Sequence, residues 1–90
     1  MKVIYTISVL SHTGEKQKDF RKRTEIPFLP TTDTLMHFNF ITSEYISPTE
    51  VVWDTDANLL WVTFADIVVE DWAFDWDELI EAILEDGFYE

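Results

Sequence analysis

Chemically active side chains are concentrated at the C-terminal end of the chain. Residues 70 to 90 read EDWAFDWDELIEAILEDGFYE, in which acidic residues are accompanied by five aromatic residues and neither Lys nor Arg occurs. Carboxylates can bind a metal ion, transfer protons, or pair with the cations of a partner protein. The residue types and spacings elsewhere in the chain help to decide among these three uses.

Two patterns could bind a metal ion, and neither is complete. The segment DTDANL, Asp54 to Leu59, has oxygen ligands at the first, third and fifth positions of a calcium loop. Leu59 and Ala65 occupy the positions at which that loop requires Gly and Glu. His12 and His37 are the only imidazoles, and their spacing does not gather the three or four ligands that zinc needs. We expect no metal and no cofactor, and we interpret DTDAN as a hairpin turn.

No catalytic constellation can be assembled from the remaining residues. Ser11 and His12 are neighbours on an extended segment, so their side chains point to opposite faces. With two glycines in the chain there is no Gly-rich loop to bind phosphates. Asp75 and Asp77 form the best carboxylate pair. General acid and base roles need an apolar pocket that separates two pKa values, and most of these carboxylates look exposed, so we expect no enzyme.

The charge is distributed unevenly along the chain. The formal net charge is −12, and all six basic residues lie within the first 23 positions, where they outnumber two carboxylates. From Thr24 to Glu90 there are sixteen carboxylates and no Lys or Arg. The basic segment KQKDFRKR could attract phosphate, but so large a negative charge repels it beyond the Debye length of about 8 Å. Direct binding to nucleic acid is therefore disfavoured.

Length and composition indicate one small folded domain, residues 1–90. The absence of Cys excludes disulfides and makes a cytoplasmic setting the default. The N-terminal run MKVIYTISVL alternates like a strand and lacks the small-residue cleavage site of a secretion signal. No segment approaches the roughly 18 apolar residues of a membrane span, so we expect no membrane association.

Alternating apolar residues and turn signals predict several strands. Two of these segments flank a turn that contains Gly14, and two flank the DTDAN turn, so each pair is predicted to form a hairpin. The predicted strands are Lys2–Leu10, Lys18–Ile26, Leu35–Ile41, Glu50–Trp53 and Leu59–Phe64, with Asp66–Glu70 as an extension or an edge.

One helix is predicted near the C-terminus. Asp75 followed by Glu78 has the form of a capping box, Gly87 suits a left-handed C-terminal cap, and Phe88 can fold back on the last turn. An apolar stripe at helical spacing comprises Trp76, Leu79, Ile80, Ile83 and Leu84. The predicted fold class is α+β: a small, mostly antiparallel sheet of about five strands that could curl toward a barrel, covered by one C-terminal amphipathic helix.

The acidic residues of this helix are placed at a cost to its own stability. Glu85 and Asp86 lie in the last turn, where the helix dipole disfavours each by about 0.3–1 kcal/mol, and Glu81 and Glu85 are like charges one turn apart. From Asp77 to Asp86 the acids average one charge per about 3.4 Å of axis, close to the phosphate spacing of a DNA strand. We therefore predict a site that binds a basic protein.

The resulting hypothesis is an inhibitor, of the kind that phages and mobile elements encode, which blocks a nuclease, restriction enzyme or CRISPR-type effector by phosphate mimicry. The predicted partner-binding residues are Asp71, Trp72, Asp75, Asp77, Glu78, Glu81, Glu85, Asp86 and Tyr89. The main alternative is a small structural or oligomerisation domain, including a homodimer through an exposed strand edge or aromatic patch, in which acidity serves solubility only. A third alternative is an enzyme subunit whose carboxylates hold a divalent ion.

Overall fold

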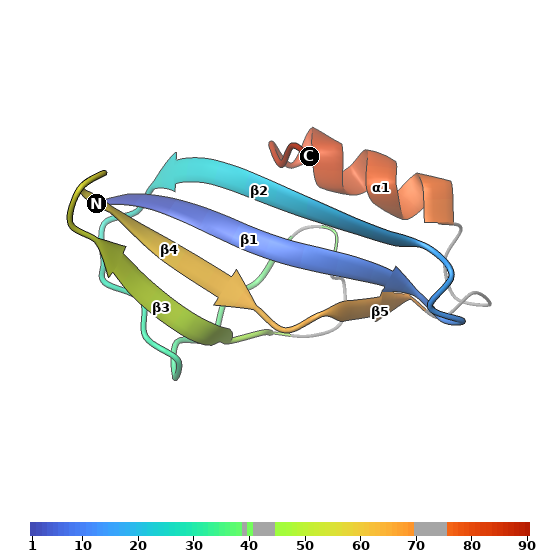
Figure 1. The fold of residues 1–90 in the computed structure, drawn as a ribbon, viewed down its shortest axis with the longest axis horizontal. Helices are drawn as coiled ribbons and strands as arrows, with labels where there is room; N and C mark the ends of the chain where they lie inside the picture. The colour runs from blue at the N-terminus through green and yellow to red at the C-terminus, as the bar shows by residue number, and fades with distance from the viewer. Residues whose placement is uncertain (39, 41–44, 70–75) are drawn as a thin grey trace.

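The computed structural model describes residues 1–38, 40, 45–69 and 76–90. Within these residues the chain forms five strands and one helix (Figure 1). In chain order they are β1 (Lys2–Ser11), β2 (Gln17–Glu25), β3 (Pro48–Asp54), β4 (Leu59–Phe64), β5 (Ile67–Val69) and α1 (Trp76–Glu85).

The five strands form one mixed, open sheet. The strand order is β2-β1-β4-β3, and β5 pairs with the far end of β1. The β1–β2 and β3–β4 pairs are antiparallel, whereas β1 is parallel to both β4 and β5. The prediction of a mostly antiparallel, barrel-like sheet was therefore wrong, although the α+β class holds. Each hairpin is specified by its own turn, but the long connection between them lets the second hairpin place β4 beside β1 in the same direction.

Both predicted hairpins are present. In the β3–β4 turn, one carboxylate oxygen of Asp54 accepts hydrogen bonds from the backbone N–H groups of Asp56 and Ala57, each at 3.0 Å. The bond from Ala57 is the main cause that holds the pKa of Asp54 below its ordinary value. Asn58 has a φ of 54°, a left-handed conformation that Asn tolerates better than most residues. These contacts confirm the interpretation of DTDAN as turn chemistry.

The predicted strand Leu35–Ile41 was wrong where the structure describes it. Met36 exchanges two backbone hydrogen bonds with Ile46, at 2.7 and 2.8 Å, in an isolated bridge. Phe38 and Phe40 are buried in the core rather than placed in the sheet. An alternating pattern reports alternating burial, and an irregular segment that inserts every second side chain into a core produces the same pattern.

The described segments cover one face of the sheet and leave the other uncovered. In Figure 1 the uncovered face is toward the reader, α1 lies along the β2 side, and the described part of the connection from β2 to β3 passes behind the sheet. The core between the sheet and these segments contains an aromatic cluster whose ring centroids lie 5.3–5.9 Å apart. Its members are Tyr5, Phe38, Phe40, Phe64 and Phe88, and burial raises the pKa of Tyr5.

The predicted helix is present and begins at Trp76, while its predicted cap, Asp75, lies outside the described residues. Leu79, Ile80 and Ile83 are buried, but Leu84 is 47% exposed, so its place in the apolar stripe was wrong. At about 100° per residue, Leu84 is turned roughly 90° from the centre of the buried stripe. The described residues contain no helix long and apolar enough to cross a membrane.

The predicted C-terminal cap is confirmed. Gly87 has a φ of 98°, and its N–H donates to the carbonyl of Leu84 at 3.1 Å. The N–H of Phe88 donates to the carbonyl of Ile83 at 3.4 Å, which completes a Schellman motif. This turn directs Phe88, which is 3% exposed, back into the aromatic cluster. The last residues of the chain are thereby held against the sheet.

Candidate functional site

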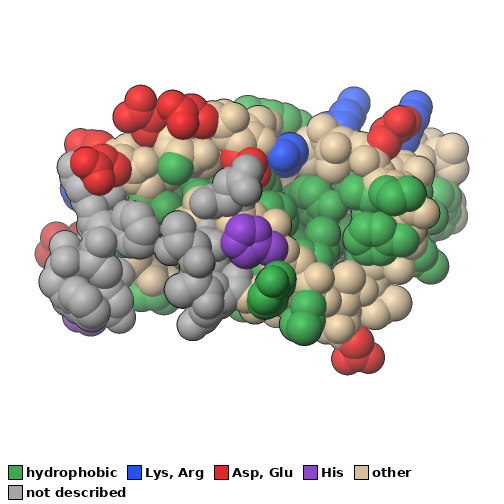
Figure 2. Space-filling view, turned by 180° about the vertical axis from the view of Figure 1, so that it is seen from behind, with side chains coloured by type: hydrophobic (Ala, Val, Ile, Leu, Met, Phe, Trp, Pro, Cys, Tyr) green, Lys and Arg blue, Asp and Glu red, His purple; other side chains and the backbone are tan. Residues whose placement is uncertain are grey.

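Three glutamates form an exposed row on α1. Glu78, Glu81 and Glu85 are exposed, and their spacing of three and four residues places them within about 60° around the helix axis, opposite the buried stripe. We call these three residues the acidic row. Figure 2 shows acidic side chains gathered along the margin of the molecule that α1 forms. No ion pair between described residues involves the acidic row.

Two other carboxylates of the same segment pair with lysines of β2. The Nζ atom of Lys22 lies 3.6 Å from Asp86 Oδ2, and the Nζ atom of Lys18 lies 2.7 Å from Glu90 Oε1. Lys22 also lies over the ring of Phe88, 5.6 Å from its centroid. Part of the acidic charge is therefore compensated inside the molecule, and the Asp86 side chain is only 16% exposed.

The placement of these lysines follows from the alternation of a strand. Residues two apart on β2 point to the same face, so Lys18, Phe20 and Lys22 point toward the side of α1. Arg21 and Arg23 point to the opposite face. The alternation of a strand separates these two groups, but it does not show that the lysines meet the C-terminal carboxylates, because that contact joins residues more than sixty positions apart.

The remaining predicted site residues occupy different environments. Asp77 is exposed in the first turn of α1, beside the acidic row. Tyr89 is 46% exposed, and its backbone exchanges two hydrogen bonds with Arg21, each 2.8 Å long, so the tail extends the edge of β2. Asp71, Trp72 and Asp75 lie outside the described residues. The structure thus brings together Asp77 and the acidic row, with Tyr89 beyond the end of the helix.

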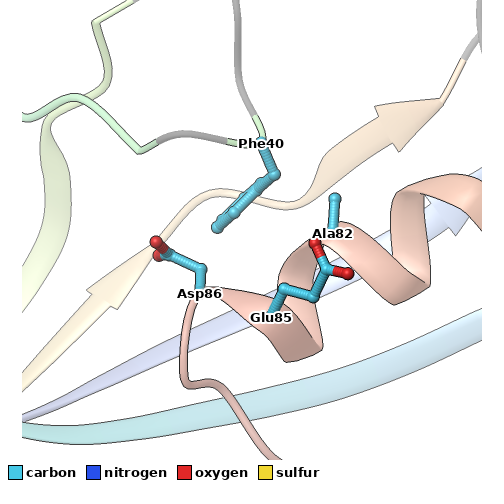
Figure 3. A pocket seen from close by; sticks show the side chains of 4 residues that line it. All are labelled: Phe40, Ala82, Glu85 and Asp86. Atoms are coloured by element: carbon cyan, nitrogen blue, oxygen red, sulfur yellow. The ribbon is translucent and has the colours of Figure 1, made fainter.

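A pocket of about 330 Å³ adjoins the C-terminal end of the acidic row. Its described lining consists of Phe40, Ala82, Glu85 and Asp86 (Figure 3). The ring of Phe40 points toward the helix, and Glu85 and Asp86 line the same pocket. An aromatic wall beside two carboxylates suits an aliphatic cationic side chain, because the stem can pack on the ring while the charge meets the oxygens.

The chain was compared with protein families, curated proteins and solved structures, and none of them matches it. The protein is thus defined by its architecture, a small α+β domain with an open mixed sheet and one amphipathic helix that presents an acidic row.

Proposed function

We propose that the protein is an acidic binding module that inhibits a nucleic-acid-handling protein by occupying its cationic groove. The acidic row supplies the charges that replace phosphates, and Asp77 extends it at the N-terminal end of the helix. Arg and Lys side chains of the partner would pair with these carboxylates. The observation that carries the proposal is the exposure of the row opposite the buried stripe, without an ion pair to any described residue.

The geometry supports mimicry of charge density rather than of individual phosphates. From Glu78 to Glu85 the helix rises about 10.5 Å, over which one strand of duplex DNA advances by about three phosphate intervals. The row therefore presents three charges where a DNA strand presents about four. Asp86, which continues the same acidic series in the sequence, is turned toward Lys22 instead.

The charge map also favours rapid association with a basic partner. The molecule carries a formal charge of −12, and an uncompensated row on a helix focuses this field at one margin. Electrostatic steering of this kind raises association rates and makes them sensitive to salt. Exposed Tyr89, and Trp72 as a further predicted anchor, would supply aromatic contact area beside the charges.

The test is an affinity capture with two charge-matched variants. The natural protein, the triple variant Glu78→Gln, Glu81→Gln, Glu85→Gln, and a control with Glu15→Gln, Asp33→Asn, Asp56→Asn are each immobilised and exposed to nuclease-treated lysate of the native host. Both variants lose three negative charges, but the control keeps the acidic row. We expect the natural protein and the control to retain a basic nucleic-acid-binding protein that duplex DNA or added salt releases. The row variant should lose it.

Two results would contradict the proposal. Equal loss in both variants would mean that net charge alone governs the capture. A partner that duplex DNA does not displace would mean that the row does not occupy a nucleic-acid site. Circular dichroism of all three proteins verifies that the fold is unchanged.

A second candidate function is that of a small oligomerisation domain. The observation that favours it is the face of the sheet that the described segments leave uncovered, which lies in a different part of the molecule from the acidic row.

A further inference from the structure

The uncovered face of the sheet has a definite arrangement of side chains. Cross-strand partners share a face, so the strand registers place Arg23, Ile4, Trp61 and Val52 in one row across β2, β1, β4 and β3. The next row in the same order is Arg21, Thr6, Thr63 and Glu50. None of these side chains belongs to the core cluster formed by the described residues. We call this surface the outer sheet face.

The centre of the outer sheet face is apolar. Ile4 is 4% exposed, Trp61 is half-buried beside it, and Val52 at the margin is 44% exposed. The Thr6 hydroxyl donates to the Thr63 hydroxyl at 3.0 Å, which satisfies one polar group on each strand within the face. An apolar centre between charged margins has the anatomy of a protein interface.

The two margins of this face carry opposite charges in the row that contains Arg21 and Glu50. Along β2, Arg21 and Arg23 are exposed and form no ion pair with a described residue. The two carboxylates of the same margin each have a polar residue opposite them on β1. Glu25 lies opposite Lys2 in the strand register, and Asp19 accepts a hydrogen bond of 2.6 Å from Ser8.

Along β3 the charges on this face are acidic. Glu50 is exposed, and Asp54 adds a second carboxylate, which accepts a bond from Trp61 Nε1 at 3.4 Å. The outer sheet face therefore has two arginines and two carboxylates on its β2 margin, two carboxylates on its β3 margin, and an apolar centre between them.

We propose that two copies of the chain pair through the outer sheet face as a symmetric dimer. If the two-fold axis runs parallel to the strands, between β1 and β4, the β2 margin of each copy lies over the β3 margin of the other. Arg21 then faces Glu50 of the second copy, twice by symmetry. A two-fold axis across the strands, midway between the two rows, would instead place β2 on β2, with Arg21 facing Arg23 of the second copy. The contact between Arg21 and Glu50 favours the first arrangement. In that arrangement Glu25 lies over Asp54 of the second copy, whose carboxylate is already held by hydrogen bonds from Asp56, Ala57 and Trp61.

The outer sheet face has a hollow beside Arg21, where Glu50 of the second copy would lie in this arrangement. Its volume is about 380 Å³, and its lining includes Thr6, Ser8, Thr63, Arg21 and Trp61. Asp19 and Asp66 also line it, and the carboxylate of Asp19 is engaged by Ser8. Glu50 of the second copy would enter beside Arg21, where the guanidinium and the Thr63 hydroxyl can donate to its carboxylate.

This pairing does not depend on the proposed inhibitory function and leaves its surface open. The core elements, α1 among them, lie on the opposite face of the sheet, so both acidic rows would point away from the interface. Four strands about 4.8 Å apart, with about six residues of 3.3 Å each, give a footprint of roughly 19 by 20 Å. Because this is small for a stable complex, we expect a dissociation constant on the order of micromolar.

The experiment is sedimentation velocity over a range of protein concentrations, with two single charge reversals. The natural protein should change from monomer to dimer as its concentration rises. Arg21→Glu and Glu50→Arg should each remain monomeric, because each places like charges together in the dimer. An equimolar mixture of the two variants should restore the dimer, with an affinity about tenfold or more higher than that of either variant alone. The control Glu15→Arg changes an exposed turn residue and should dimerise like the natural protein.

Several outcomes would overturn the proposal. A natural protein that stays monomeric at every concentration removes the dimer. A dimer that neither reversal affects removes this face, and a mixture that does not re-form the dimer removes the proposed two-fold axis. Binding of single-stranded DNA or RNA by the natural protein, lost in Arg21→Glu, would assign the face to nucleic acid instead. Circular dichroism of each variant separates a lost interface from a lost fold.

Discussion

Two groups of carboxylates lie within the last thirteen residues of this protein and have opposite surroundings. Glu78, Glu81 and Glu85 point away from the domain, whereas Asp86 and Glu90 meet lysines of β2. The two groups have the same chemistry and nearly the same sequence context. What differs is their direction relative to the sheet, which the helical period sets for the first group and the Schellman turn sets for the second.

Within one acidic segment, some carboxylates therefore help to hold the fold together while others stay exposed to solvent. The paired carboxylates help to hold the tail along β2, where the backbone of Tyr89 already bonds to Arg21. The acidic row makes no such ion pair within the described residues, so its charges contribute little to holding the domain together. Substitutions can therefore affect the two groups separately.

The largest expected effect comes from removing the anchor of the paired group. Phe88→Ala deletes a ring that is 3% exposed and packs edge-on against Phe38 and Phe40. Truncation of a buried Phe typically costs about 3–5 kcal/mol of unfolding free energy. Urea denaturation of Phe88→Ala, with Tyr89→Ala as the exposed control, measures it. A similar loss in both variants would show that the tail is not anchored by burial.

A smaller effect should distinguish the two lysine pairs. Lys22→Gln removes the pair with partly buried Asp86 and the contact with Phe88, so we expect a loss of about 1 kcal/mol in unfolding free energy. Lys18→Gln breaks a pair whose side chains are 42% and 54% exposed, and should cost less than about 0.5 kcal/mol. The same urea denaturation applies to both. A larger cost for Lys18→Gln would reverse the assignment of which pair holds the tail.

The smallest effects concern the acidic row and should have opposite signs at its two ends. Glu85→Gln removes a negative charge from the last turn of α1 and a like-charge neighbour of Glu81, so stability should rise by about 0.5 kcal/mol. Glu78→Gln removes a favourable charge from the first turn and should lower stability by a few tenths of a kcal/mol. Thermal melting at low and high salt tests this, because salt should diminish both effects. If both variants changed stability in the same direction at low salt, the helix dipole would not be the main electrostatic effect on these glutamates.

The local elements were largely predictable because each has a local cause. The DTDAN turn, the Gly87 cap and the buried positions Leu79, Ile80 and Ile83 follow from neighbouring residues alone. The prediction failed where burial came from distant parts of the chain. Leu35–Ile41 has the alternation of a strand, but its two described phenylalanines alternate because they enter an aromatic cluster built by other elements. Leu84 lies at the edge of the apolar stripe, and how much of that stripe is buried depends on how the helix packs against the sheet.

The α+β class, the two hairpins, the amphipathic helix with its glycine cap, and the separation of cations from anions could all be read from the order of the residues. Three features became visible only in the folded molecule: the two hairpins join through parallel β1 and β4, Lys18 and Lys22 compensate two of the C-terminal carboxylates, and the described segments leave one face of the sheet uncovered. The two groups of features differ in the range of the interactions that produce them. Turns, caps and helical periodicity involve residues a few positions apart, whereas sheet order and charge compensation depend on which distant surfaces can be buried together.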